Sequence, residues 1–79
     1  MVQVTMCGYL ADRAGWRERA VEADTLAVLK VRLAAQQPSL AGLLDGGRIF
    51  TVVNDVVTRG DAPIGNADEV AFMPPIGGG

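Results

Sequence analysis

One segment of this chain has the repeat of a long helix, and that repeat limits the folds open to it. Between residues 24 and 38, leucines recur at intervals of three and four residues, which places Leu26, Leu29 and Leu33 on one helical face. Pro38 marks the end of the segment. A helix with one apolar face buries that face against another layer, so the remaining segments must supply a partner surface.

The segments before this helix have the two-residue period of β-strands. Residues 1–7 alternate between two parities, which is the pattern of a half-buried strand. Residues 8–16 contain two glycines and predict a turn or loop. Residues 16–23 alternate again, and we expect them to pair back with the first strand as a hairpin. The apolar positions of the first strand are Val2, Val4 and Met6.

The segments after the helix predict further strands separated by turns. Residues 48–54 are β-branched and aromatic and predict a third strand. Asn54 and Asp55 are candidates for a turn, and a short return strand can begin at residues 56–57. Residues 69–73 predict the last strand. A short apolar turn of helix is expected between the main helix and the third strand.

This order of elements predicts an α+β fold of the β-grasp, ubiquitin-like type. Such a fold has a mixed sheet of four to five strands with one main helix packed on one face. Val70 and Phe72 of the last strand share the parity expected for the core. We expect one β-grasp domain over residues 1–75, followed by a flexible glycine tail at residues 76–79.

Composition excludes several classes of function. The chain has 79 residues, one cysteine and no histidine, so zinc sites, Cys–His nucleophile pairs and histidine acid–base catalysis are not expected. We therefore predict no enzyme activity for the chain alone, no metal and no bound cofactor. The net charge is −2 with scattered basic residues, so nucleic-acid binding is not expected. No signal-peptide pattern or membrane-length apolar run occurs, and we expect a cytoplasmic protein.

The C-terminal sequence points to a known family. Residues 68–79 read DEVAFMPPIGGG, and residues 52–55 read VVND. An acidic pair, an apolar strand, Pro-Pro, two residues and a final Gly-Gly resemble the small, sulfur-carrying subunit of molybdopterin synthase. The strand and turn at VVND resemble the same family, whose length and element order match the whole chain.

The resemblance implies a role as a carrier subunit without catalytic groups of its own. In that family an E1-like adenylating enzyme uses ATP to activate the carboxylate of the last glycine, here Gly79. Sulfur from a donor protein then replaces AMP and leaves a C-terminal thiocarboxylate. The tail next enters the large subunit of molybdopterin synthase and gives its sulfur to a pterin precursor, in molybdenum cofactor biosynthesis. The resemblance also implies a heterotetramer with two copies of each subunit.

The tail residues suit that chemistry. Gly77 and Gly78 have no Cβ and can pass through narrow channels to present Gly79. Pro74 and Pro75 restrict the backbone and end the last strand, and Ile76 can anchor the base of the tail, so these three residues are expected to position it. Three residues on the strand parity opposite the core are expected to form a partner surface: Cys7, Ala71 and Met73.

Three other functions share the glycine tail. The chain could carry sulfur for thiamin or cysteine synthesis, or it could be a ubiquitin-like modifier whose Gly79 forms amides with target lysines. It could also be a binding module with a disordered tail. Adenylation of Gly79 is common to the carriers and the modifier, so the tail alone does not separate them.

Overall fold

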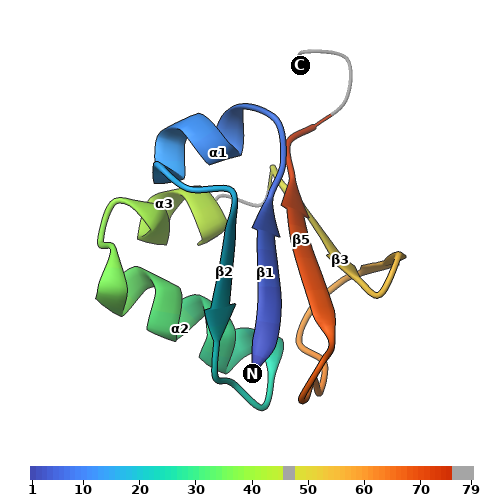
Figure 1. Cartoon of the computed structure of the whole chain (residues 1–79). Coiled ribbons are helices and arrows are strands. Elements are labelled where there is room, and N and C mark those ends of the chain that lie inside the picture. The colour runs from blue at the N-terminus through green and yellow to red at the C-terminus, as the bar shows by residue number, and fades with distance from the viewer. Residues whose placement is uncertain (46–47, 76–79) are drawn as a thin grey trace.

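The computed structural model describes residues 1–45 and 48–75, which form a five-stranded sheet with three helices (Figure 1). In chain order the elements are β1 (Val2–Met6), α1 (Tyr9–Ala14), β2 (Glu18–Val21), α2 (Leu26–Gln36), α3 (Leu40–Asp45), β3 (Phe50–Val53), β4 (Val56–Thr58) and β5 (Glu69–Met73). The strand order is β2-β1-β5-β3-β4. β1 and β5 are parallel and the other neighbours are antiparallel, so the sheet is mixed, as predicted.

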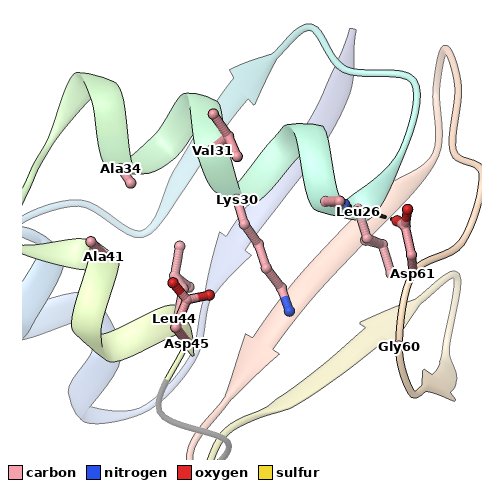
Figure 2. Close-up of a pocket in the computed structure, with 10 residues that line it drawn as sticks. Leu26, Lys30, Val31, Ala34, Ala41, Leu44, Asp45, Gly60 and Asp61 are labelled. Atoms are coloured by element: carbon pink, nitrogen blue, oxygen red, sulfur yellow. Dashed lines mark hydrogen bonds between the residues drawn. The ribbon is translucent and has the colours of Figure 1, made fainter.

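The main helix, α2, begins where side chains from two segments satisfy its first backbone N–H groups. The Thr25 hydroxyl accepts a hydrogen bond from the Val28 backbone nitrogen at 3.1 Å. The carboxylate of Asp61, from the segment between β4 and β5, accepts one from the Ala27 nitrogen at 2.9 Å (Figure 2). Because the first N–H groups of a helix have no partner within it, these bonds stabilise the start of α2. They also tie the β4–β5 connection to the helix.

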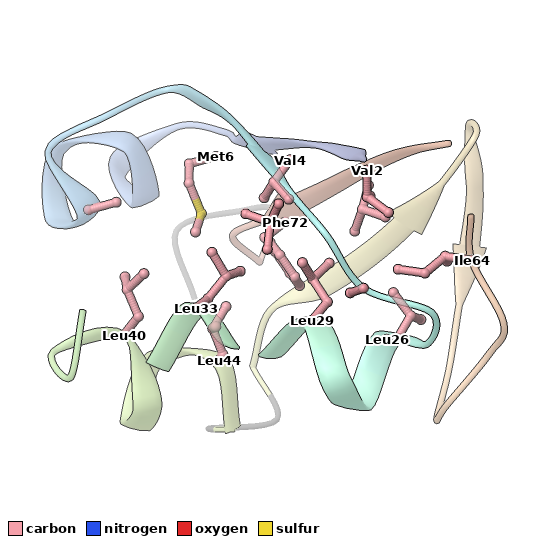
Figure 3. Close-up of a cluster of buried hydrophobic side chains, with 14 of the residues drawn as sticks. Val2, Val4, Met6, Leu26, Leu29, Leu33, Leu40, Leu44, Ile64 and Phe72 are labelled. Atoms are coloured by element: carbon pink, nitrogen blue, oxygen red, sulfur yellow. The ribbon is translucent and has the colours of Figure 1, made fainter. Parts of the chain in front are cut away.

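The core lies between one face of the sheet and the helices α2 and α3 (Figure 3). The leucine face predicted for α2 is buried, and so are the predicted core positions of β1 and β5. α3 follows α2 on the same side of the sheet and adds Leu40 and Leu44 to the core. The side chains exposed by less than 2 % are Val2, Val4, Met6, Leu10, Leu26, Leu29, Leu33, Leu40, Val70 and Phe72.

The prediction of a loop at residues 8–16 was wrong, because Tyr9–Ala14 form the short helix α1. Leu10 and Ala14 lie four residues apart on its buried face. Gly15 ends the helix in the left-handed conformation at φ 82°. A segment of six residues is too short to show a helical repeat in its sequence. The two glycines, which suggested a loop, flank the helix and cap its two ends. β1 and β2 still pair antiparallel as predicted, but α1 connects them and not a tight hairpin turn.

A polar cluster fixes the connection between α1 and β2 against the end of α2. The indole nitrogen of Trp16 donates to the side-chain oxygen of Gln37 at 3.0 Å. The Gln37 amide nitrogen in turn donates to the backbone oxygen of Ala14 at 2.7 Å. The Arg19 guanidinium lies 4.4 Å from the Trp16 ring centroid, a cation–π contact. Trp16 therefore acts here as a packing residue that joins α1 to the rest of the fold.

Asn54 links the turn after β3 to the start of β5. It adopts a left-handed conformation with φ 48°, which asparagine tolerates better than most residues. Its side-chain oxygen accepts a hydrogen bond from the Glu69 backbone nitrogen at 2.9 Å, and its amide nitrogen donates to the Asp68 carboxylate at 3.1 Å. The same carboxylate accepts a hydrogen bond from the Gly65 nitrogen at 2.8 Å. The VVND and DE sequences are thus in contact, and together they set where β5 begins.

We predict that Asn54→Gly lowers the free energy of unfolding by about 1–3 kcal/mol, because it removes both side-chain hydrogen bonds while keeping a residue suited to positive φ. Urea denaturation of the purified chain measures this loss. Asp55→Gly is the matched control, since Asp55 occupies the other positive-φ position of the same turn, at φ 69°. Equal losses in the two variants would contradict the role assigned to the Asn54 amide.

Candidate functional site

The candidate site is the base of the C-terminal tail and the sheet surface beside it. Four of the predicted tail residues lie outside the described residues: Ile76, Gly77, Gly78 and Gly79. Pro74 and Pro75 are described and half-buried, directly after the end of β5. The site is therefore described through the contacts that hold these two prolines in place.

The end of β5 is held on both sides because β5 is the central strand of the sheet. On one side Phe72 pairs in register with Met6 of β1, and the backbone nitrogen of Cys7 donates to the Phe72 oxygen at 3.0 Å. On the other side Met73 pairs with Phe50 of β3. A terminus that leaves from a central strand starts from a fixed point, whereas an edge strand would fray more easily.

Gly8 makes room for the first proline of the tail. Its backbone has φ 57° and ψ −138°, a region that glycine adopts and other residues rarely do. A Cβ at this position would lie 3.0 Å from the Cγ of Pro74. Sequence reasoning missed this contact, because it assigned Gly8 only to a loop. The available signal was a glycine directly after the predicted first strand, residues 1–7, at the position where a parallel last strand would end.

The sheet surface opposite the helices carries an apolar patch next to the tail. Register places Ala71 between Val52 and the β1 residue Thr5, and it places Val57 beyond Val52. Phe50 and Met73 form the next row, toward the tail. We call the following residues the open-face patch: Phe50, Val52, Val57, Ala71 and Met73.

The structure brings the three predicted partner-surface residues to this region. Met73 is exposed, Ala71 is half-buried within the open-face patch, and Cys7 is half-buried directly after β1. Sequence reasoning missed Phe50 and Val57, which are exposed by 39 % and 56 %. The alternation of side chains along β3 and β4 could have indicated that these two residues face the open surface. Only the strand order shows that they lie on the same surface as the residues of β5.

Polar and acidic side chains border the open-face patch on the side of β1 and β2 and at the start of β5. The Gln3 amide donates to the Glu18 carboxylate at 3.3 Å, and Gln3 pairs in register with Glu69. Glu18 and Glu69 are both exposed. Register places Glu18 opposite Thr5, in the row of Ala71, so one carboxylate borders the open-face patch along β2 and the other lies at the start of β5.

The main feature that the described residues provide for function is an exposed surface and not a set of catalytic side chains. Within residues 1–45 and 48–75, no group of three or more His, Cys, Asp or Glu side chains is arranged to hold a metal ion. The helices in these ranges are all too short or too polar to cross a membrane. What this arrangement can do is hold the base of a C-terminal segment at the end of a central strand, beside an apolar patch.

A mixed five-stranded sheet with one main helix, whose central last strand leads into a glycine-rich end, defines a small ubiquitin-like protein of the β-grasp class. A model of the ThiS family matches residues 4–79. The molybdopterin synthase sulfur carrier subunit of Escherichia coli is 33 % identical over 81 residues, and the alignment covers all of both chains. The chain belongs to the ThiS family.

Solved structures confirm the β-grasp prediction. The solution structure of small archaeal modifier protein 1 from Methanosarcina acetivorans is similar with a TM-score of 0.87 at 21 % identity, covering 99 % of this chain and 95 % of that one. The crystal structure of the Haloferax volcanii protein of the same name has a TM-score of 0.78 at 25 % identity, with 99 % and 98 % covered.

We predict that Gly8→Ala lowers the free energy of unfolding by about 1–3 kcal/mol and shifts the backbone amide resonance of Met73, since the added Cβ strains the backbone and meets Pro74. Urea denaturation and NMR measure the two effects. Gly42→Ala is the control: Gly42 lies exposed in α3 with nothing within 4 Å of its added Cβ, so this change is expected to stabilise by roughly 0.5–1 kcal/mol. Wild-type stability in Gly8→Ala would refute the packing role of Gly8.

Proposed function

We propose that this chain carries sulfur as a thiocarboxylate on Gly79 and donates it to a pterin precursor bound by the large subunit of molybdopterin synthase. The observation that carries the proposal is the full-length similarity to the E. coli sulfur carrier subunit of that synthase. The tail sequence supports it, because Pro-Pro and the terminal glycines follow directly on the central strand β5.

The proposed chemistry needs other proteins to supply the reactive groups. An E1-like adenylating enzyme joins the Gly79 carboxylate to AMP and releases pyrophosphate from ATP. A persulfide on the sulfur donor protein then attacks the acyl adenylate, and AMP leaves, which gives an acyl disulfide between the two proteins. A thiol reduces the S–S bond of that disulfide, so the donor is released and the thiocarboxylate stays on Gly79. Adenylation makes the carbonyl reactive because AMP is a far better leaving group than hydroxide. The carrier itself contributes only an unhindered carbonyl, and glycine provides the least hindered one.

We propose that the open-face patch docks on the large subunit while the tail reaches its active site. The patch adjoins the end of β5, so a partner bound there lies beside the point where the tail begins. Four residues beyond Pro75 span roughly 13 Å when extended, at about 3.3 Å per residue. That reach suffices to place Gly79 inside a neighbouring pocket while the domain stays on the surface.

A role as a protein modifier is the second candidate. The Haloferax volcanii protein, which is 25 % identical and nearly the same length, is named as a small archaeal modifier protein. In that role Gly79 forms an amide with a target lysine, after the same adenylation step. A carrier for thiamin or cysteine synthesis would also share this step and would differ in the acceptor of the sulfur.

The intact mass of the chain, purified from its own cells without a C-terminal tag, tests the proposal. We expect a form heavier by the exchange of one oxygen for sulfur, with the change mapped to Gly79. Deletion of Gly79 removes this form and is the control. Only unmodified chain, after incubation with ATP, an adenylating enzyme and a sulfur donor, would overturn the carrier function. Recovery of Gly79 mainly in amides with lysines of other proteins would favour the modifier.

We predict that Phe50→Asp or Met73→Asp weakens binding to the large subunit by at least about tenfold, because a charge is placed in the apolar centre of the contact. Titration calorimetry with the purified large subunit measures the dissociation constant. Val28→Asp is the matched control, since Val28 is exposed by 37 %, as Met73 is, but lies on α2 at the opposite side of the sheet. Equal weakening by all three substitutions would place the contact elsewhere.

A further inference from the structure

β4 forms one edge of the sheet, and its outer side has no partner in the part of the chain that the structure describes. Strand order places it beyond β3, the only strand with which it pairs. Within residues 1–45 and 48–75, no backbone hydrogen bond joins β4 to a segment other than β3. The β4 residue Val56 is exposed by 64 %, and Val57 beside it is also exposed.

β4 lacks the features by which natural edge strands avoid pairing with another chain. Such strands carry charges, prolines or bulges that keep other strands away from their unpaired backbone groups. The other edge strand, β2, begins with Glu18 and Arg19, whereas β4 consists of two valines and a threonine. An uncharged, β-branched edge suits the addition of a further strand. Because β4 has only three residues, a strand that pairs with it has to match a short register.

The turn before β4 determines which backbone groups of the strand face outward. This turn has two residues, both at positive φ (48° and 69°), and Val53 lies opposite Val56 across it. In a two-residue hairpin the residues that flank the turn form a hydrogen-bonded pair, so the backbone groups of Val56 point toward β3. Since these directions alternate along a strand, the N–H and C=O of Val57 point away from β3, toward the free edge.

The sequence around Val57 is complementary to itself in an antiparallel pairing. Two β4 strands centred on Val57 can exchange the N–H and C=O groups of that residue in two hydrogen bonds. The same register places Val56 opposite Thr58 of the second copy. One position further out, it places Asp55 opposite Arg59 of the second copy, and both of these residues are exposed. Because the arrangement is two-fold symmetric, it contains two such pairs of opposite charge.

We propose that β4 is a contact surface for a second copy of this chain, with the two-fold axis at Val57. The symmetric spacing of Asp55 and Arg59 about Val57 favours a second copy, because a strand of another protein would need to carry the same charges in the same order. The pairing joins the two sheets into one and keeps both open-face patches on the same side. The two β5 strands then run in opposite directions, so the tails leave from opposite ends. The proposal goes beyond the proposed function and needs no chemistry at Gly79.

The first test is self-association of the purified wild-type chain. The contact is small, so we expect a weak dimer that forms as the chain is concentrated from about 10 µM to about 1 mM. Sedimentation equilibrium measures the association, and NMR over the same range shows whether the backbone amide resonances of β4 shift with it. A chain that stays monomeric, or a dimer that leaves the β4 amides unchanged, would overturn the proposal.

Charge reversal tests the register of the pairing. Arg59→Glu and Asp55→Lys each place like charges opposite each other, and we expect each variant to dimerise at least about tenfold more weakly than wild type. An equimolar mixture of the two variants restores both pairs of opposite charge, so it is expected to recover association as a heterodimer. Arg48→Glu makes the same charge change at an exposed position outside the contact and is the control. Failure of the mixture to associate, or equal weakening by Arg48→Glu, would contradict the proposed pairing.

Val57→Pro tests the backbone contact. Proline has no N–H, and at this position the N–H points to the free edge, so the hydrogen bonds between β3 and β4 are kept. We expect dimerisation to weaken at least about tenfold, while the amide resonances of the core strands are retained. Dimerisation as strong as that of wild type would refute pairing through β4. If this substitution unfolds the chain, the mixture of charge-reversed variants decides the question.

Discussion

The parallel pairing of β1 with β5 is the interaction on which the rest of this structure depends. It joins the first and last strands in the middle of the sheet, so the C-terminal segment starts from a strand hydrogen-bonded on both sides. The same pairing places Val4 and Met6 beside Val70 and Phe72, which face the leucines of α2. The same strand pairing therefore determines both the packing of the core and the position of the base of the tail. A sequence change that loosens the core near Phe72 also loosens the base of the tail.

Much of this arrangement could be predicted from the sequence, because the core strands and α2 have clear periods. Alternation in β1 and β5 identified the buried residues, and leucine spacing identified the buried face of α2. α1 could not be predicted in the same way, since six residues complete fewer than two helical turns. Its identity as a helix depends on tertiary packing of Leu10 and Ala14, and no local signal reports that packing.

The candidate site was predictable only in part, for a related reason. The parity of β5 placed Ala71 and Met73 on the open surface, but Phe50 and Val57 joined them only once the strand order was known. Gly8 and Asn54 act through partners more than ten residues away, Pro74 and Asp68. Sequence shows that a glycine follows a strand or that an asparagine occupies a turn. It does not show which distant backbone needs the space or the hydrogen bond.

The two sides of the sheet separate two requirements of an activated terminus. The proposed function requires a docking surface for the sulfur acceptor next to the base of the tail, and the open-face patch lies beside the end of β5. The proposed function also requires that a nucleophile able to attack the activated carbonyl lie away from that base, and the chain's single lysine, Lys30, lies on α2. Arginine at the other six basic positions supplies positive charge without a competing amine. Under the proposed function, the partner that docks at the open-face patch therefore determines whether the activated carbonyl meets sulfur or nitrogen.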